Sequence, residues 1–169
     1  MTYLAKRQVD TNIVVDQAED EIAAINFAIG ASYAGARAMT GSSGGGVSLM
    51  VEAFGLAGIT ETPVVVVDSQ RPGPATGLPT RTEQSDLSFL LTAAQGEFPR
   101  SVISVRNAED AFYKTVKALN LADKYQTLVI LLTDQYLADS TVIIPKYDLS
   151  KVKIESYIDD GNDLLDGEE

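Results

Sequence analysis

The sequence contains no cysteine and no histidine. Without these residues the chain has no disulfide, no thiolate ligands for an iron–sulfur cluster and no Cys/His zinc site. A catalytic triad that uses histidine is excluded as well. If electrons move in the reaction of this protein, we therefore expect their carrier to sit on another polypeptide.

Long apolar runs and nucleotide-binding motifs are also missing. No stretch approaches the roughly 18 consecutive apolar residues of a membrane span, and the N-terminal MTYLAKRQVD lacks the apolar core of a signal peptide. These features predict a cytoplasmic protein without membrane contact. No G-x-G-x-x-G follows a strand pattern and no G-x-x-x-x-G-K-[ST] occurs, which disfavours a dinucleotide Rossmann site and a P-loop.

Positive charge is scarce, since the formal net charge is −11. A nucleic-acid binder needs a basic face, so this class is disfavoured. Seven of the acids lie between residues 155 and 169, where there is no basic residue. This segment is either an acidic interaction tail or a solvated end, and the second interpretation is favoured.

The length of 169 residues and the hydrophobic content of 45% indicate one domain with a proper core. Four consecutive valines, Val64 to Val67, and the run TLVILL at 127–132 are typical of strands buried on both faces. Alternating strands and helices predict an α/β fold with an open, mostly parallel sheet and helices on both faces. We expect the domain to span 1–140, with a connector and acidic tail at 141–169.

The remaining elements are predicted from apolar periodicity and capping residues. Other strands are expected at 10–16, 36–40 and 101–105, a helical remnant at 1–8, and helices at 20–35, 47–57, 82–94, 108–121 and 134–138. Thr82 is the expected N-cap of the helix at 82–94, and a turn is expected at 44–46.

An acidic triplet, Glu19-Asp20-Glu21, precedes a helix of small residues. Ala24, Ala28, Ala31 and Gly35 share one face of this helix, and Glu21 lies one turn before it. The helix dipole favours a solvated carboxylate there, whereas burial in an apolar interface would raise the pKa of Glu21. Taken alone, the triplet favours the interpretation of an ordinary acidic helix N-terminus over that of a site.

Two further segments are candidates for ligand binding. Gly41 to Gly46 (GSSGGG) offers bare backbone at a helix start, suited to an anion or a flat ring, although a flexible turn has the same composition. Gln70 to Arg81 (QRPGPATGLPTR) leaves the carboxyl end of the valine strand, where open α/β sheets bind ligands. Connections of this length are usually functional. Arg81 offers a planar fork for a carboxylate, or pairs with Glu83, Asp86 or a partner.

Three segments carry a resemblance to a known family. EDEIAAINFAIGASYAGARAMT, SLMVEAFGLAGITETP and QRPGPATGLPTRTEQSDL resemble the alpha subunit of 2-oxoacid:ferredoxin oxidoreductases, most nearly the 2-oxoglutarate type. An apolar strand, a glutamate and an alanine-rich helix with glycine nine residues later (Glu21, Gly30) are similar to the pyrimidine-binding domain of thiamine-diphosphate enzymes. The match spans roughly residues 10–140, with its motifs in the family's order.

The resemblance implies roles for individual residues. Glu21, with Glu19 as runner-up, would hydrogen-bond the pyrimidine nitrogen N1′ of thiamine diphosphate and is the implied catalytic residue. Ser43, Gly44 and Gly45 would line the cofactor, although Gly45 stands where the family usually has proline. Thr80 and Arg81 would face the 2-oxo acid, with Arg81 on its carboxylate. No metal ligand is expected in this chain.

The diphosphate-binding half of such a site has no counterpart in the sequence, because no Gly-Asp-Gly motif is followed by the required asparagine. The resemblance implies that a beta subunit supplies this half, with its Mg²⁺ and an iron–sulfur cluster. The chain would then be inactive alone, and the complex would convert a 2-oxo acid and CoA to acyl-CoA while reducing ferredoxin. We expect the partner to dock near Ala24, Ala28 and Leu49, and the chain to be truncated at both ends.

Two alternatives stay open at this point. The substrate could be pyruvate or a branched-chain 2-oxo acid, because only the pocket separates these from 2-oxoglutarate. The chain could also be a non-catalytic interaction module that keeps the fold without the site.

Overall fold

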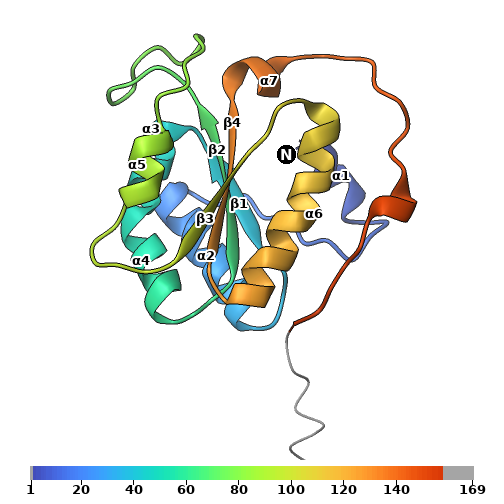
Figure 1. The fold of residues 1–169 in the computed structure, drawn as a ribbon, viewed down its shortest axis with the longest axis horizontal. Coiled ribbons are helices and arrows are strands. Elements are labelled where there is room, and N and C mark those ends of the chain that lie inside the picture. Colours follow the sequence, from blue (N-terminus) through green and yellow to red (C-terminus); the bar gives the residue numbers. More distant parts are fainter. Residues whose placement is uncertain (1, 158–169) are drawn as a thin grey trace, which may run out of the picture.

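The computed structural model describes residues 2–157, which contain a four-stranded sheet in the order β1-β2-β4-β3 (Figure 1). All neighbouring strands are parallel, and Val66 of β2 pairs with Ile130 of β4 at its centre. The strands are β1 Met39–Ser42, β2 Val64–Gln70, β3 Arg100–Ser104 and β4 Leu128–Asp134. The predicted parallel α/β fold is confirmed.

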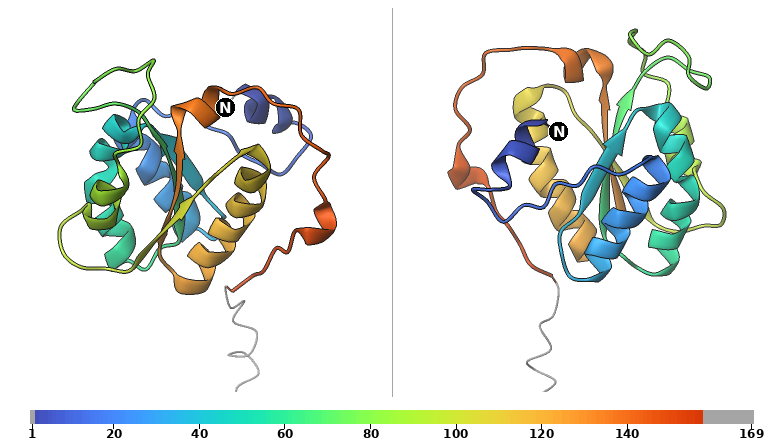
Figure 2. Two further views of the ribbon diagram at one scale, coloured as in Figure 1. Left: turned by 45° about the horizontal axis from the view of Figure 1, so that its top comes forward. Right: turned by 180° about the vertical axis from the view of Figure 1, so that it is seen from behind.

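Helices cover both faces of the sheet. α2, α4 and α5 lie on one side, and the long helix α6 lies on the other (Figures 1 and 2). The α-helices are α1 Thr2–Arg7, α2 Glu21–Tyr33, α3 Gly44–Val47, α4 Val51–Ile59, α5 Leu87–Thr92, α6 Ala108–Tyr125 and α7 Gln135–Asp139. Two 3-10 helices, η1 Ser48–Met50 and η2 Leu149–Lys151, complete the described elements.

The valine strand divides the core into two layers, because successive side chains of a strand point to opposite faces. Val64 and Val66 pack with Phe54 of α4 in the larger layer. Val65 packs on the other side with Ala118 and the rest of the inner face of α6. Both central strands are therefore buried on both faces, as predicted.

The prediction of a strand at 10–16 is wrong. The chain there has no strand pairing, and the side chain of Val14 is 90% exposed. α1 lies on the α6 side of the sheet, and the following segment crosses to the side that carries α2 (Figure 2). A short β-branched run with exposed polar neighbours does not bury enough apolar surface to join the sheet. Met1 of the predicted helical remnant lies outside the described residues.

Two further predictions near the sheet edge are wrong in detail. The helix expected at 82–94 begins only at Leu87, so Asp86 rather than Thr82 occupies its N-cap position. The backbone N–H of Asp86 donates to Gln70 Oε1 at 3.0 Å, which holds the preceding chain out of a helical path. The glycines at 44–46 form the first turn of α3 instead of a loop, because Val47 and Met50 that follow them are fully buried.

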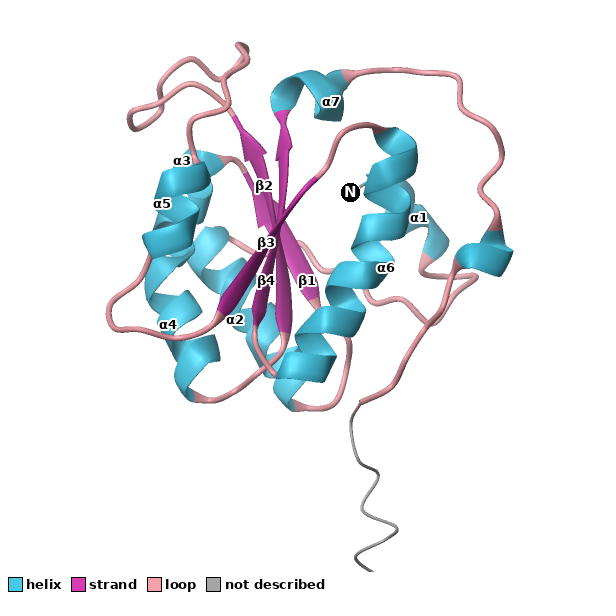
Figure 3. Ribbon diagram, viewed as in Figure 1, coloured by secondary structure: helices cyan, strands magenta, loops and turns pink. Residues whose placement is uncertain are grey.

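After α7 the chain runs as an irregular connector past α6 (Figure 3). Asn120 of α6 holds it, since its Nδ2 donates to the Lys153 carbonyl at 2.7 Å. The acidic tail from residue 158 lies outside the described residues, and the predicted boundary at 140 stays a prediction. Within 2–157, every helix is too short or too polar to cross a membrane.

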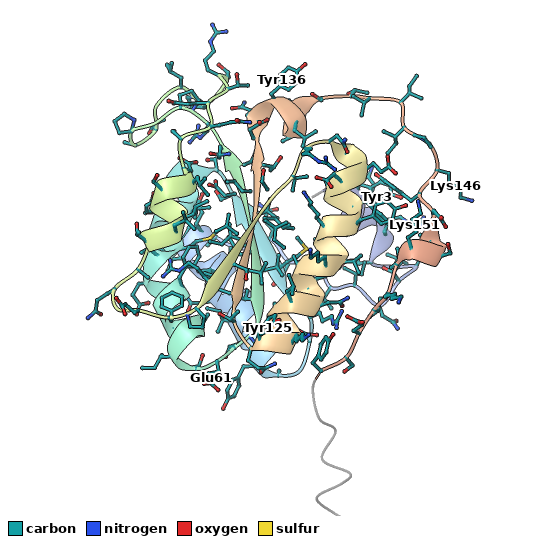
Figure 4. The ribbon with its side chains drawn as sticks, in the orientation of Figure 1. Tyr3, Glu61, Tyr125, Tyr136, Lys146 and Lys151 are labelled. Carbon is teal, nitrogen blue, oxygen red and sulfur yellow. The ribbon has the colours of Figure 1, made fainter. Side chains whose placement is uncertain are left out.

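The carboxyl and amino ends of the strands differ in the segments that surround them. Tyr136 on α7 marks the side of the sheet where the carboxyl ends of the strands lie. Glu61 and Tyr125 mark the opposite side, where the strands begin (Figure 4). The turn of α3, the long loop from 71 to 86 and α7 all follow directly from the carboxyl ends of strands. This is the edge at which open α/β sheets bind ligands.

Candidate functional site

Glu21 lies in the first turn of α2, next to the carboxyl ends of the strands. The side chain of Asp20 caps the helix, its Oδ1 accepting from Ala23 N at 2.8 Å, and this fixes where the helix begins. Glu21 is half-buried, and its Oε1 accepts a hydrogen bond from Ser42 Oγ at 3.2 Å. The carboxylate therefore points towards the end of β1, not into bulk water. Glu19, the runner-up, is exposed.

Bare backbone closes one side of the Glu21 carboxylate. A Cβ added at Gly46 would lie 2.6 Å from Glu21 Oε1 and would overlap the Ser42 hydroxyl. Gly44 and Gly46 are buried, whereas Gly45 is exposed. The glycine turn of α3 thus brings main chain against an acid that is only partly solvated, an arrangement that suits a flat ring with a hydrogen-bonding nitrogen.

Ser43 and Arg71 form the polar part of a neighbouring pocket. Arg71 Nε donates to Ser43 Oγ at 2.8 Å, and Ser43 makes no side-chain cap to α3. The pocket has a volume of about 250 Å³ and is lined by Ser43, Ser69, Arg71, Pro79 and Gln135. Arg71 as a whole is half-buried. It offers a planar cation with unused donors, which is the usual partner of a carboxylate.

Thr80 and Arg81 lie apart from this pocket. Both are exposed on the long loop, and neither contributes to the pocket lining, although the adjacent Pro79 does. The loop folds on itself there, with Arg81 N donating to the Leu78 carbonyl at 3.0 Å. The predicted contact of these two residues with substrate stays a prediction.

Arg71 was not singled out from the sequence as a site residue. The segment contains two arginines, and composition does not say which one faces inward. A positional signal existed, because Arg71 is the first residue after β2 and so begins at the sheet edge, whereas Arg81 follows ten residues of loop.

Both ends of the long loop are tied to the sheet. Gln70 is buried, and its Nε2 donates to the Thr133 carbonyl of β4 at 3.2 Å while its Oε1 accepts from Asp86 N. Near the other end, Gln84 Nε2 donates to Asp134 Oδ2 at 2.5 Å. Gln84 and Asp86 therefore hold the end of the loop against the sheet.

An acidic pair that sequence reasoning missed lies below the glycine turn. Asp68 of β2 is fully buried, and burial, reinforced by the charge of Asp86, raises the pKa of Asp68 to about 8. The available signal was an aspartate directly after four buried valines.

A larger hollow of about 310 Å³ lies between α6 and the connector, lined by residues that include Lys117, Lys124 and Lys153. It contains none of the predicted site residues. Volume alone therefore does not mark the site, whereas convergent polar groups at the strand ends do.

Comparison with protein families matches residues 1–162 to the model described as "Pyruvate flavodoxin/ferredoxin oxidoreductase, thiamine diP-bdg". The chain is 56% identical over 144 residues to "2-oxoacid:ferredoxin oxidoreductase subunit alpha" of Saccharolobus solfataricus, covering 85% of this chain and 23% of the relative. It is 42% identical over 154 residues to "2-oxoglutarate synthase subunit KorA" of Archaeoglobus fulgidus, covering 89% and 43%.

A solved structure is similar as well. "2-oxoglutarate:ferredoxin oxidoreductase from Magnetococcus marinus with 2-oxoglutarate, coenzyme A and succinyl-CoA bound" matches with a TM-score of 0.90 and 46% identity, over 95% of this chain and 28% of that chain. The chain spans about a quarter of the length of this structure and of the Saccharolobus relative.

Proposed function

Because the chain belongs to the thiamine diphosphate-binding family of pyruvate flavodoxin/ferredoxin oxidoreductases, we propose that it is the pyrimidine-binding half of a 2-oxoacid:ferredoxin oxidoreductase. The reaction is the oxidative decarboxylation of a 2-oxo acid to an acyl-CoA, with electrons passed to ferredoxin. The observation that carries this proposal is the half-buried Glu21 carboxylate, held by Ser42 against the bare backbone of Gly46.

The residues of the chain fit the pyrimidine end of the cofactor. When bound, thiamine diphosphate supplies the carbon nucleophile that attacks the 2-oxo acid. Glu21 would hydrogen-bond the pyrimidine N1′ and hold a proton at that atom, which is the one tuned acid this chemistry asks of the protein. Ser42 orients Glu21, and Ser43, Gly44 and Gly45 leave the ring room to approach main chain.

Arg71 is the proposed anchor for the carboxylate of the 2-oxo acid. Its guanidinium lines the pocket beside Ser43, next to the glycine turn of α3. Thr80 and Arg81 remain candidates for a second contact. Because both side chains are exposed, that contact requires the loop to fold over the substrate.

A beta subunit would supply the diphosphate-binding domain, its Mg²⁺ and the iron–sulfur cluster. The predicted docking face needs one correction: Ala28 is only 7% exposed and packs in the core. Leu49 is 55% exposed and Ile22 is 52% exposed, on helices η1 and α2, which pack together. These two apolar side chains are the proposed docking contacts, since unpaired apolar surface beside a site is typical of subunit interfaces. A cytoplasmic location stays a prediction.

The substrate proposed is 2-oxoglutarate, in keeping with the printed names of the Archaeoglobus relative and the Magnetococcus structure. The test mixes this chain with the beta subunit and measures CoA-dependent viologen reduction with 2-oxoglutarate, pyruvate and a branched-chain 2-oxo acid. We expect turnover only in the mixture, fastest with 2-oxoglutarate. Turnover by the isolated chain would contradict the proposal, and an assembled but inactive complex would favour the interaction module.

The glycine turn gives a local test of the cofactor site. Gly46→Ala places a methyl group against Glu21 Oε1 and Ser42, and both side chains can swing away, so the fold should survive. We expect the affinity of the complex for thiamine diphosphate to fall roughly tenfold, the size of one lost hydrogen bond. The dissociation constant of the cofactor can be measured by calorimetric titration of the complex, or from the cofactor concentration that protects the complex against trypsin.

Gly55→Ala is the matched control for that variant. A Cβ there meets only the Gln95 carbonyl at 3.9 Å and the Ala94 side chain at 4.0 Å, and Gly55 lies on α4, outside the glycine turn. We expect the Gly55 variant to bind the cofactor within about twofold of wild type. Equal losses in both variants would mean that cofactor binding responds to any added methyl group and would not support a specific contact between the turn and Glu21.

A further inference from the structure

Two neighbouring acids of the described chain, one buried and one half-buried, have carboxyl oxygens that are buried without a hydrogen-bond partner. Asp68 on β2 has no exposed surface, and neither of its carboxyl oxygens has a partner at ordinary hydrogen-bond geometry. Asp86, at the start of α5, has the same deficit at Oδ2. Buried polar groups are normally satisfied, so such a pair needs an explanation.

The pair lies directly under the glycine turn of α3. A Cβ added at Gly44 would lie 2.7 Å from Asp86 Cγ and would overlap Asp86 Oδ2. Two residues further along, Gly46 faces Glu21. One helical turn is therefore in contact with the acidic pair at its first glycine and with Glu21 at its third.

The electrostatics favour one proton on the pair. Burial raises the pKa of both acids, and Glu83 of the loop raises the pKa of Asp86 further. Asp68 acts in the opposite direction and lowers the pKa of Asp86, as expected if a protonated Asp68 donates to an ionised Asp86. Among the described residues no ion pair joins Asp68 or Asp86 to a basic side chain, and the nearby Arg71 donates to Ser43 Oγ instead.

We propose that Asp68 and Asp86 share one proton at neutral pH and thereby act as positioning residues, fixing the Gly44–Gly46 turn against Glu21. Two neighbouring carboxylates, one of them fully buried, do not both ionise without strong repulsion. With one proton the pair becomes a hydrogen-bonded unit that holds the loop end at Asp86 to strand β2. The consequence for Glu21 rests on the proposed function, whereas the shared proton does not.

A shared proton makes the stability of the fold depend on pH. Asp68 keeps its proton in the folded state up to about pH 8 but loses it near pH 4 when unfolded. The folded state thus binds one more proton across that range, so stability falls as the pH rises from 4 to 8 and levels off above. One proton makes the unfolding equilibrium constant rise about tenfold per pH unit.

The test compares urea unfolding of the full chain between pH 5 and pH 9 in wild type and Asp68→Asn. Asparagine keeps a neutral donor towards Asp86, so we expect a stable fold whose pH slope is smaller by one proton. Asp139→Asn, which removes an exposed carboxylate at the end of α7, should keep the wild-type slope. An unchanged slope in Asp68→Asn would overturn the shared proton.

A second measurement, on the wild-type chain, tests the shared proton even if Asp68→Asn folds poorly. Infrared difference spectra of the wild-type chain between pH 6 and pH 9 should show a buried protonated carboxyl that disappears at the higher pH. Absence of that band would overturn the proposal. In the complex with the beta subunit, the KM for thiamine diphosphate should rise from pH 7 to pH 9 in wild type only. An equal rise in Asp68→Asn would overturn the positioning role. The role of Glu21 is tested separately, by Glu21→Gln.

Discussion

Replacement of Glu21 by glutamine is expected to lower the turnover of the complex with the beta subunit by roughly 10²- to 10⁴-fold, the usual contribution of a positioned acid or base. Glutamine has nearly the size of glutamate, so the contacts with Ser42 and Gly46 should persist. Under the proposed function, what is lost is the ability to hold a proton at the pyrimidine N1′. The effect should therefore appear in kcat and not in assembly.

The measurement is CoA-dependent viologen reduction, with complex formation checked by size-exclusion chromatography. Glu19→Gln is the matched control, because Glu19 belongs to the same acidic triplet but is exposed. We expect the Glu19 variant to keep at least half of wild-type turnover, since an exposed charge at a helix start contributes little. Equal turnover in wild type and Glu21→Gln would contradict the role assigned to Glu21. A large loss of turnover in Glu19→Gln alone would assign that role to Glu19.

The sequence was sufficient for the central sheet because its signals are strong and local. Four consecutive valines are typical of a strand buried on both faces of a parallel sheet covered by helices, and the structure places Val64 to Val67 in such a strand. The run at 10–16 carries a weaker version of the same signal, but Val14 is exposed and unpaired. Strand propensity depends on partners, and the sequence of one segment does not say whether the sheet has an open edge available for it.

Local propensity failed where distant side chains decide the backbone. The segment 82–86 has an acceptable helix N-cap in Thr82, yet the bond from Asp86 N to Gln70 Oε1 joins residues that are 16 apart and delays the helix. The glycines at 44–46 have poor helix propensity, yet they form a helical turn in which only glycine leaves room for Asp86 and Glu21.

The candidate site likewise contains residues that the sequence could predict and residues that only the fold brings together. Glu21 could be proposed from its spacing to Gly30 and from the family resemblance, and the structure places it half-buried. Its neighbours Ser42 and Gly46 follow from how α2, β1 and α3 meet, which no local pattern records. Asp68 and Asp86 are 18 residues apart and belong to different elements, so their contact is visible only in the folded chain.

Replacement of Arg71 by methionine is expected to raise the KM for the 2-oxo acid by about 10- to 100-fold, with a smaller change in kcat. Hydrogen bonds to charged groups contribute about 1.5–3 kcal/mol, which corresponds to this range. Arg71→Lys should recover only part of the loss, because an ammonium lacks the planar fork. Steady-state kinetics of the complex over a range of 2-oxo acid concentrations separates the two parameters.

Arg81→Met is the control that decides between the two arginines of the loop. Both substitutions remove one positive charge from the same segment, so a general electrostatic effect on an anionic substrate would change both KM values alike. A larger effect at Arg71 requires direct contact in the pocket with Ser43, and a larger effect at Arg81 requires that the loop close over the substrate. Since Arg71 already lines the pocket and Arg81 is exposed, the first outcome needs no rearrangement of the chain. The second would show that substrate binding itself orders the loop, and it would restore the assignment made from sequence alone.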